Sequence, residues 1–383
     1  MDHLPNLPAG VASRTLPVND LQMHILEAGH GHTPQRPLVL LLHGFPELAY
    51  SYRKLLVPLS LLGYHVVAPD QRGYGRTCPS PLPSYADSPA PYRLFNLVRD
   101  VVALVYALGH DTAHAVIGHD FGSPLAGFCA LLRPDVFLRL ACMSAPFPGA
   151  PSLATTDRQR NVLDLVPEFA ALSPPRKHYK LYYSTPAANA DMHHPSTPGG
   201  LPAFLRAYFH AKSADASDDP LPHPLSPTAE SLSALPAYYL MPLHASMPQA
   251  VENSLPSPEE VAANAWLTDA ELAVYAREFA RTGFQGGLNW YRAATDAALM
   301  ADLSAFARKR VYAPAVFIGG ERDWGVHQDP GALDQMREVC VTMGKEDVHI
   351  VRGAGHWIMQ EQPEETLRVL TELLQRPVRK VPQ

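Results

Sequence analysis

The sequence predicts an α/β fold in which a mostly parallel β-sheet is flanked by helices and carries an inserted, mainly helical cap subdomain. Two observations predict the core: short apolar runs typical of buried strands, and amphipathic helical patterns that alternate with them. A third predicts the insertion, because this alternation stops after Pro146 and returns only near residue 315. At 383 residues the chain is long for one compact unit, which agrees with one large domain plus an insertion.

The predicted elements of the first half follow one another closely. Residues 21–26 alternate as in a half-buried strand, whereas 37–42 and 65–70 are nearly continuous apolar runs, typical of strands buried on both faces. Within residues 94–108 the apolar side chains fall on one helical face, and Gly109 is suited to end that helix. The pattern continues with a strand over 113–118, a helix after Gly122 and a strand over 138–144.

The middle of the chain is rich in proline. Between Pro195 and Pro258 lie 12 of the 39 prolines, so long loops are expected there, because proline breaks regular structure. Helices are nevertheless predicted over 201–212 and 269–281. The α/β pattern then returns with strands over 315–319 and 348–351 and a final helix near 364–374. We therefore predict a core formed by residues 1–146 and 298–383, and a cap formed by residues 147–297.

Composition and charge exclude several function classes. The net charge of −6 gives no electrostatic reason to expect nucleic acid or an acidic membrane as a partner. No run of about 18 apolar residues occurs, so no membrane-spanning helix is expected. The N-terminus has no basic segment before an apolar run, so no signal peptide is expected either, and a reduced, cytoplasmic location fits best.

The cysteine and histidine patterns give no sign of a metal or a cofactor. The four cysteines are scattered without metal-ligand spacing, and Cys129 and Cys142 lie in apolar stretches, as buried free thiols do. His193 and His194 lack further ligands at a workable spacing. We therefore expect no metal site and no cofactor.

The segment Gly118-His119-Asp120-Phe121-Gly122 predicts a nucleophile on a tight turn between a strand and a helix. Such a turn strains the backbone, leaves room only for small neighbours and exposes its central side chain. The backbone N–H groups at the start of the following helix point toward that side chain. Asp120 is therefore the candidate nucleophile, although an aspartate in this position can also serve only as a helix cap.

Two downstream residues are suited to support Asp120. Asp323 follows the strand over 315–319, and His356 follows the strand over 348–351 among small residues. The order nucleophile, acid, histidine is the order of the triad in the α/β-hydrolase arrangement. The gap from Asp120 to Asp323, 323 − 120 = 203 residues, is far longer than a bare core needs, which independently predicts the cap.

The segment His43-Gly44-Phe45-Pro46-Glu47 follows the buried strand over 37–42, where this arrangement has its second oxyanion donor. The backbone N–H groups of Phe45 and Phe121 form the candidate pair of donors. The alternative is that the segment is only a tight turn ordered by proline. We assign His43 and His119 to structural hydrogen bonds.

These segments resemble those of the soluble epoxide hydrolases of the α/β-hydrolase superfamily, over nearly the whole chain. The most discriminating match lies in the predicted cap, where residues 287–292 resemble the segment with one epoxide-binding tyrosine, which implies Tyr291. The family's second such tyrosine lies in a segment that resembles residues 179–183. There the pattern points to Tyr182, with Tyr179 and Tyr183 as nearby alternatives. The matching segments are His43-Gly44-Phe45-Pro46-Glu47, Asp70-Gln71-Arg72-Gly73-Tyr74-Gly75, Gly118-His119-Asp120-Phe121-Gly122, Glu321-Arg322-Asp323, Gly355-His356-Trp357 and Gly287-Leu288-Asn289-Trp290-Tyr291-Arg292.

The resemblance implies an enzyme that opens an epoxide to a vicinal diol, with the epoxide and water as its partners. Asp120, already ionised at neutral pH, would attack a saturated carbon and form an ester while the cap tyrosines protonate the epoxide oxygen. His356, oriented by Asp323, would then activate the water that hydrolyses this ester, and the Phe45 and Phe121 N–H groups would stabilise the oxyanion. A serine would instead form an ether, which resists hydrolysis.

Two features depart from the family pattern. The residue after the nucleophile is often tryptophan in these enzymes and is Phe121 here, and the proline-rich part of the predicted cap is unusually long. A substrate preference therefore cannot be transferred from the family.

Two other functions compete with this interpretation. A dehalogenase shares the Asp–His–Asp chemistry, but haloalkane enzymes typically use tryptophan, and haloacid-type relatives arginine, where Phe121 stands. A ligand receptor on the same fold would have lost catalysis, which the intact set of Asp120, Asp323 and His356 argues against.

Overall fold

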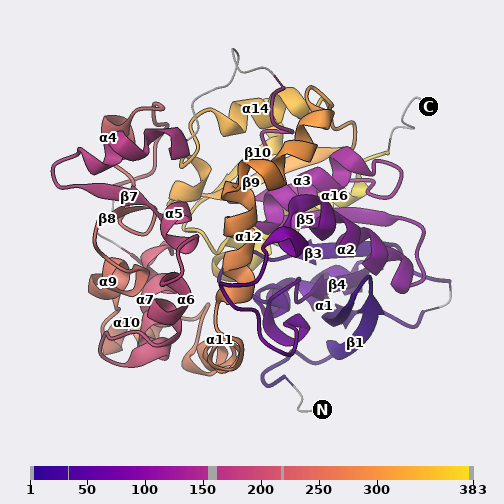
Figure 1. The fold of residues 1–383 in the computed structure, drawn as a ribbon. Coiled ribbons are helices and arrows are strands. Elements are labelled where there is room, and N and C mark those ends of the chain that lie inside the picture. Colours follow the sequence, from indigo (N-terminus) through magenta and orange to yellow (C-terminus); the bar gives the residue numbers. More distant parts are fainter. Residues whose placement is uncertain (1–3, 33, 154–161, 217–219, 379–383) are drawn as a thin grey trace.

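A computed structural model describes residues 4–32, 34–153, 162–216 and 220–378. Its centre is an eight-stranded sheet with the strand order β1-β2-β4-β3-β5-β6-β9-β10 (Figure 1). β1 and β2 pair antiparallel, as do β2 and β4, and the remaining neighbours pair parallel. The predicted, mostly parallel sheet is thus confirmed. The eight strands are β1 (Ala12–Val18), β2 (Leu21–Ala28), β3 (Leu38–Leu42), β4 (His65–Pro69), β5 (Ala113–His119), β6 (Leu140–Met143), β9 (Ala315–Gly320) and β10 (Val348–Val351).

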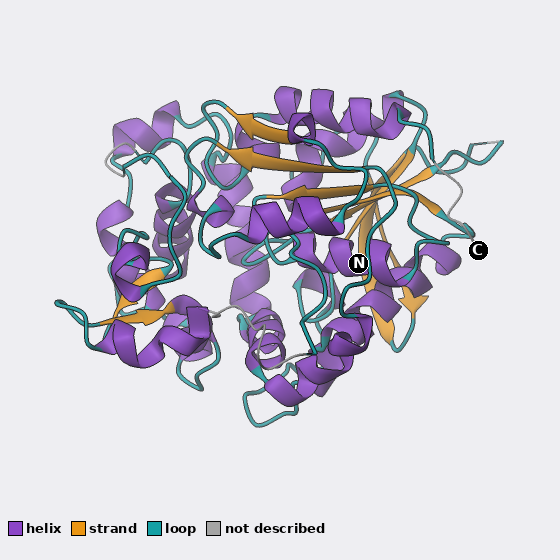
Figure 2. Ribbon diagram, turned by 90° about the horizontal axis from the view of Figure 1, so that it is seen from above, coloured by secondary structure: helices purple, strands orange, loops and turns teal. Residues whose placement is uncertain are grey.

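The central strands are fully apolar because both faces of the sheet are covered. Every residue of β3 and of β9 is buried, as expected for parallel strands between two layers of helices. Helices α1 and α16 contact each other over one part of the sheet, and α2 and α3 contact each other over another. Figure 2 shows helices on both sides of the strands. The helices of the core are α1 (Arg53–Leu61), α2 (Leu94–Ala107), α3 (Gly122–Leu132), α14 (Ala332–Val339), α15 (Ile358–Glu361) and α16 (Pro363–Gln375).

The segment between β6 and β9 is mainly helical and contains one two-stranded sheet, β7 paired with β8. Most of it lies to the left of the eight-stranded sheet in Figure 1. This arrangement agrees with an inserted cap, whose limits at 147 and 297 stay a prediction. Its elements are α4 (Val166–Ala170), β7 (Arg176–His178), α5 (Tyr179–Tyr183), α6 (Ala188–His193), α7 (Gly200–Ala211), α8 (Ala229–Leu232), β8 (Leu240–Pro242), α9 (Met247–Val251), α10 (Pro258–Ala263), α11 (Asp269–Thr282), α12 (Gln285–Thr295) and α13 (Ala297–Met300).

The proline-rich segment contains more regular structure than its composition predicts. Helices α9 and α10 both begin with a proline in the first turn after a serine. In each case the serine side chain accepts an N–H from the third helical residue, whose own side chain binds the serine N–H in return. Proline is well tolerated at this position, because its missing N–H would have no partner inside the helix. The expectation of long loops between Pro195 and Pro258 is therefore wrong at α9, whereas α10 begins at the last residue of that range.

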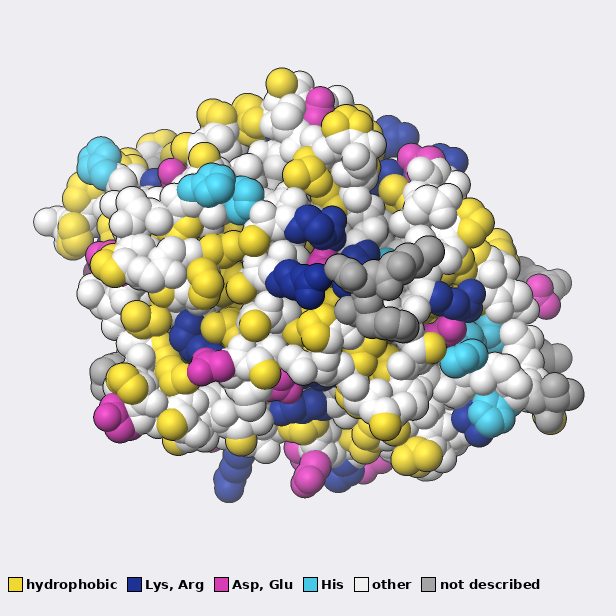
Figure 3. All heavy atoms as spheres, turned by 90° about the horizontal axis from the view of Figure 1, so that it is seen from below, with side chains coloured by type: hydrophobic (Ala, Val, Ile, Leu, Met, Phe, Trp, Pro, Cys, Tyr) yellow, Lys and Arg dark blue, Asp and Glu magenta, His cyan; other side chains and the backbone are white. Residues whose placement is uncertain are grey.

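No helix in the described part of the chain combines the length and apolar character that a bilayer crossing needs. Basic and acidic side chains are scattered among apolar and uncharged ones on the face of the molecule in Figure 3.

Candidate active site

Asp120 stands on a strained turn at the centre of the sheet. The turn joins β5, which pairs with β3 and β6, to α3. The φ of Asp120, 51°, lies in the left-handed region, which is uncommon for a residue other than glycine. A Cβ at Gly118 would lie 2.0 Å from the carbonyl oxygen of Gly122, and one at Gly122 would lie 2.2 Å from that of Leu42. The two glycines are therefore required for the turn that presents Asp120.

Three residues from separate parts of the sequence meet at the carboxyl ends of the parallel strands. The His356 Nε2 atom lies 3.2 Å from Oδ2 of Asp120, and its Nδ1 atom lies 3.0 Å from Oδ1 of Asp323. All three side chains are buried. The backbone N–H of Gly325 also donates to Oδ1 of Asp323 at 2.7 Å, which fixes the carboxylate that faces the imidazole. The structure thus brings together the three residues that the sequence suggested as a triad.

The surroundings of Asp120 favour its ionised form. Burial alone would raise the pKa of its carboxyl group, but the hydrogen bond with His356 and the positive charge of Lys212 hold this pKa below its usual range. Burial would likewise raise the pKa of Asp323, and the charge of His356 together with their hydrogen bond lowers it. Both groups are therefore carboxylates at neutral pH.

One of the two suggested oxyanion donors is in contact with Asp120. The backbone N–H of Phe45 donates to Oδ1 of Asp120 at 3.0 Å. A Cβ on the preceding Gly44 would lie 2.4 Å from the Asp120 side chain, so only glycine allows this approach. Phe121 follows the nucleophile at the start of α3, and its ring packs edge-on against Tyr291, with the ring centroids 5.1 Å apart. The role of its N–H stays a prediction.

The two histidines assigned to structural hydrogen bonds, His43 and His119, connect the loops around the site. His119 lies between Oε2 of Glu47, at 2.6 Å from its Nδ1, and the carbonyl oxygen of His356, at 2.7 Å from its Nε2. The Nε2 atom of His43 accepts the backbone N–H of Gln71 at 3.1 Å. The loops that carry Phe45 and His356 are thus linked through His119.

Tyr291 lies in α12, and its ring packs against Phe45 and Phe121. Its buried ring lies edge-on to Phe45, with the centroids 5.5 Å apart, and to Phe121. Burial and the negative charge of Asp120 raise the pKa of Tyr291 well above its ordinary value. The hydroxyl group therefore keeps its proton at neutral pH and is able to donate it.

The second tyrosine segment is arranged differently from the sequence-based choice. In α5, the Tyr182 hydroxyl donates to Oδ2 of Asp191 at 3.0 Å, so the structure does not bring it to Asp120. Tyr179 and Tyr183, four residues apart on one helical face, both have their rings against Tyr291, at centroid distances of 5.9 and 4.9 Å.

Tyr179 and Tyr183 differ in where their hydroxyl groups lie. The Tyr183 hydroxyl donates to that of Tyr208 at 3.2 Å. The Tyr179 hydroxyl donates to Oε1 of Gln328 at 3.2 Å, and burial and the charge of Asp120 raise its pKa well above the ordinary value. Tyr179, weighed from the sequence only as an alternative to Tyr182, is thus the residue of α5 whose buried ring contacts Tyr291 and whose pKa is raised by the charge of Asp120 as well as by burial.

Lys212 is a further charged residue near these carboxylates, and no sequence pattern pointed to it. It follows α7, and its positive charge lowers the pKa of both Asp120 and Asp323. In the sequence it is only the last residue of a predicted amphipathic helix.

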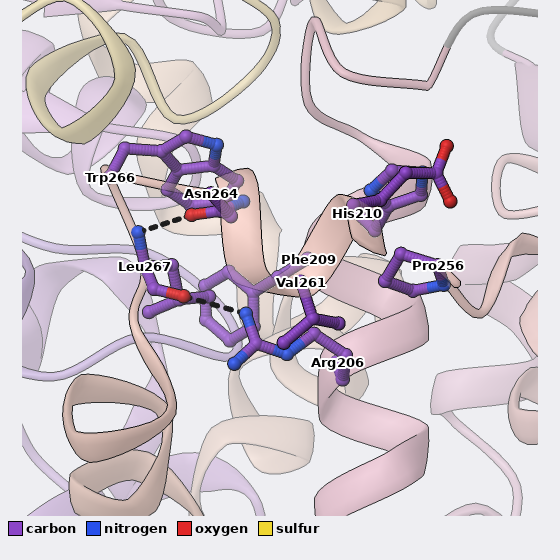
Figure 4. Close-up of a pocket in the computed structure, with 9 residues that line it drawn as sticks. Arg206, Phe209, His210, Pro256, Val261, Asn264, Trp266 and Leu267 are labelled. Atoms are coloured by element: carbon purple, nitrogen blue, oxygen red, sulfur yellow. Dashed lines mark hydrogen bonds between the residues drawn. The ribbon is translucent and has the colours of Figure 1, made fainter. Parts of the chain in front are cut away.

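Two negative findings limit the site. Among the described residues, no group of three or more His, Cys, Asp or Glu side chains is arranged to hold a metal ion. The pocket of Figure 4, between Arg206, His210 and Trp266, is lined by residues from α7, α10 and the loop before α11. It contains no member of the triad and therefore does not mark the active site.

Comparison with known proteins agrees with this geometry. The family model described as "alpha/beta hydrolase fold" matches residues 37–363. "Epoxide hydrolase B" of Mycobacterium tuberculosis is 33% identical over 346 residues, which cover 89% of this chain and 92% of the relative. "Epoxide hydrolase 2" of Siraitia grosvenorii is 31% identical over 94% of this chain and 98% of the relative.

Solved structures give the same result. An epoxide hydrolase from an endophytic Streptomyces superimposes with a TM-score of 0.74 and 31% identity, over 96% of both chains. Epoxide hydrolase I of potato (Solanum tuberosum) superimposes with a TM-score of 0.67 and 28% identity, over 95% of this chain and 99% of the other. A mostly parallel sheet, a strained strand-to-helix turn at its centre and relatives of this similarity lead to one assignment. The chain belongs to the epoxide hydrolase family of the α/β-hydrolase superfamily.

Proposed function

We propose that this enzyme opens an epoxide to a vicinal diol in two steps through a covalent ester on Asp120. The observation that carries the proposal is a pair of contacts made by the Asp120 carboxylate. Its Oδ1 accepts the backbone N–H of Phe45, and its Oδ2 faces His356. These contacts give the two oxygens different tasks. Membership of the epoxide hydrolase family supports the choice of an epoxide as the substrate.

In the first step, Oδ2 of Asp120 attacks a carbon of the epoxide ring. A new carbon–oxygen bond forms, the ring carbon–oxygen bond breaks, and the ring oxygen leaves as an alkoxide that takes a proton. Oδ1, held by the Phe45 N–H, becomes the carbonyl oxygen of the resulting ester. The low pKa of the Asp120 carboxyl group means that no base is needed for this attack.

We assign the proton that the alkoxide takes to the cap tyrosines Tyr291 and Tyr179. The two buried rings contact each other, and burial together with the charge of Asp120 raises the pKa of both phenols, so both are protonated at neutral pH. The Tyr179 hydroxyl donates to Gln328 in the free enzyme, so it has to leave this partner before it donates to the ring oxygen. Tyr182 is replaced in this role because its hydroxyl already donates to Asp191.

In the second step, His356 Nε2 takes a proton from water, and the resulting hydroxide attacks the carbonyl carbon of the ester. Asp323 fixes the orientation of the imidazole through Nδ1 and stabilises the imidazolium. The negative charge that develops on Oδ1 is stabilised by the N–H groups of Phe45 and Phe121. Collapse of this tetrahedral intermediate releases the diol alkoxide, which takes the proton from His356 and leaves Asp120 as a carboxylic acid. Asp120 then gives up its proton, which replaces the proton that the cap tyrosine donated in the first step, and the carboxylate is restored.

Neither a dehalogenase nor a catalytically inactive receptor is favoured by a specific observation. The ring of Phe121 carries no N–H or charge with which to hold a leaving halide. A receptor has no need of the ion-pair contacts that join His356 to two carboxylates. The panel of substrates for the enzyme should therefore consist of epoxides, with haloalkanes as the contrasting set.

A single turnover in ¹⁸O-labelled water tests the covalent route. With enzyme in excess over a racemic aryl epoxide, the diol should be unlabelled, and the label should appear in the peptide that contains Asp120. The reason is that the first diol oxygen comes from Oδ2, whereas water replaces it in the carboxylate. A labelled diol and an unlabelled peptide at the first turnover would show direct attack by water and would exclude Asp120 as the nucleophile.

A further inference from the structure

Lys212 is a buried cation that no ion pair explains. Only 3% of its surface is exposed, whereas lysine is almost never fully buried without a partner. Its Nζ atom lies 4.9 Å from the ring centroid of Tyr239, 5.4 Å from that of Tyr208 and 5.5 Å from that of Trp357. Within the described ranges, no carboxylate oxygen lies within 4.0 Å of this ammonium group. The cation is therefore held by aromatic faces rather than by an acid.

The charge of Lys212 acts on the catalytic carboxylates from a distance. It lowers the pKa of Asp120 and of Asp323, two groups whose burial would otherwise raise it. It also lowers the pKa of Tyr208, although burial keeps that pKa above its ordinary value. In an interior with few water molecules, such a charge is screened much less than at the surface.

The backbone ties Lys212 to the proposed base. The N–H of His356 donates to the carbonyl oxygen of Lys212 at 2.7 Å. A Cβ on Gly355 would lie 2.5 Å from that same oxygen, so glycine is needed for this close approach. On the neighbouring residue, the Trp357 indole N–H donates to the carbonyl oxygen of Phe209 in α7 at 2.8 Å. The end of α7 and the loop that carries His356 therefore form one packed unit.

We propose that Lys212 is a positioning residue that keeps His356 neutral, and so able to accept a proton, when the ester on Asp120 is hydrolysed. The inference rests on the proposed two-step function. In the free enzyme, the imidazole of His356 contacts two carboxylates, those of Asp120 and Asp323. Once Asp120 is an ester, Asp323 is the remaining carboxylate in contact with the imidazole, and the Lys212 cation offsets it. Three other titratable groups surround this loop. The ring centroid of His119 lies 4.9 Å from that of His356, and Glu361 accepts the N–H groups of Gly355 and Trp357. The third is Tyr239, whose pKa is raised by burial and by the charge of Asp323.

The test measures the two half-reactions separately. Single-turnover experiments on the whole enzyme, with an aryl epoxide as the probe, give the rates of ester formation and ester hydrolysis between about pH 5 and 9. Lys212→Met and Lys212→Gln remove the charge and keep most of the length of the side chain. In the pH profile of the ester-hydrolysis rate, both variants should shift the acid limb to a pH higher by about one unit. On that limb the hydrolysis rate should fall about tenfold, and at high pH it should change little.

Two variants serve as controls. Lys212→Arg keeps the cation and should leave the acid limb at its wild-type position. Lys177→Met removes a cation that lies over another cap ring, that of Tyr182 at 5.1 Å, and should also leave the limb unmoved. Melting temperatures of all variants show whether the fold is intact.

The possible outcomes are distinct. An unmoved acid limb in the two neutral variants, or an equal loss at every pH, overturns the inference and leaves Lys212 as a packing residue. Failure of both neutral variants to fold, while Lys212→Arg folds, also overturns it, because the charge would then support the fold and not the base. Absence of any ester in the wild-type enzyme is a different result, since it removes the proposed function itself.

Discussion

The backbone N–H of Phe45 donates to Oδ1 of Asp120 at 3.0 Å, while Oδ2 of the same carboxylate faces His356. The two oxygens of one side chain thus have different neighbours before any substrate binds. An oxyanion donor already in contact with Oδ1 costs no reorganisation when charge later develops there. We therefore expect substitutions around Asp120 to affect ester formation and ester hydrolysis separately.

Loss of the base should trap the covalent ester. His356→Gln keeps a side chain that can form hydrogen bonds but cannot take a proton from water, so ester formation should continue while turnover stops. Intact-protein mass spectrometry should detect a mass increase equal to that of one epoxide, and peptide mapping should locate it on Asp120. Asp120→Ala is the matched control and should remain unmodified. Normal turnover by the His356→Gln enzyme would place the base elsewhere.

The cap tyrosines should control ring opening and leave ester hydrolysis nearly unchanged. Tyr291→Phe and Tyr179→Phe each remove one hydroxyl, and each should slow ester formation at least about tenfold, because general acid catalysis contributes about 10² or more. The double variant should be almost inactive. Rapid-mixing measurements of ester formation test this expectation.

Tyr182→Phe is the matched control for the cap tyrosines, because its hydroxyl donates to Asp191 instead of facing the nucleophile. We expect this variant to open epoxides at close to the wild-type rate. A severe loss in Tyr182→Phe together with a normal Tyr179→Phe enzyme would reverse the assignment and restore the choice made from the sequence.

Acid should destabilise the fold through Asp70. This buried carboxylate accepts the backbone N–H groups of Ala49 and Arg76 and lies 2.8 Å from Nδ1 of His24. Burial would raise its pKa, but the charge of His24 and these hydrogen bonds lower it to about 2 from an ordinary 3.8. A carboxyl group with a depressed folded-state pKa stabilises the fold fully above its unfolded value and loses this contribution as the pH falls toward the folded value.

The stabilisation by Asp70 should therefore be present above about pH 4 and disappear toward pH 2, with a magnitude on the order of 2 kcal/mol. Urea unfolding of the wild type and of Asp70→Asn across this range measures it. The gap in unfolding free energy between the two proteins should be largest above pH 4 and should narrow as the pH falls. A gap that stays constant with pH would mean that the Asp70 charge makes no contribution of its own.

Sequence periodicity was sufficient for the core, and the strand ends it predicts were sufficient to bring the three residues of the suggested triad together. The continuous apolar runs of β3 and β9 are typical of strands in a sheet covered on both faces, and each residue of the suggested triad follows a strand that the pattern predicts. The end of a strand fixes where a residue lies along the sheet, so Asp120, Asp323 and His356 could be placed together without coordinates.

The same patterns could not predict how a helix of the cap is rotated about its own axis. Which of Tyr179, Tyr182 and Tyr183 faces the nucleophile depends on the rotation of α5 against the core, and three tyrosines in five residues leave that rotation open. The burial of Lys212 depends on rings from distant segments, including Tyr239 and Trp357. Such contacts are set by tertiary packing and leave no local mark in the sequence.

The turn at Asp120 should tolerate no side chain at Gly118. The Cβ of an alanine there would lie 2.0 Å from a backbone oxygen, so the chain itself has to move, and the left-handed conformation of Asp120 moves with it. We expect Gly118→Ala to lose about 1–3 kcal/mol of stability through overpacking and to form no ester even at a temperature where it is folded. Gly127→Ala in α3 is the matched control, because its Cβ would instead lie 2.2 Å from the ring of Phe147. That variant should be destabilised to a similar extent and should still form the ester on Asp120. Equal loss of ester formation in both folded variants would mean that the strained turn has no special part in presenting the nucleophile.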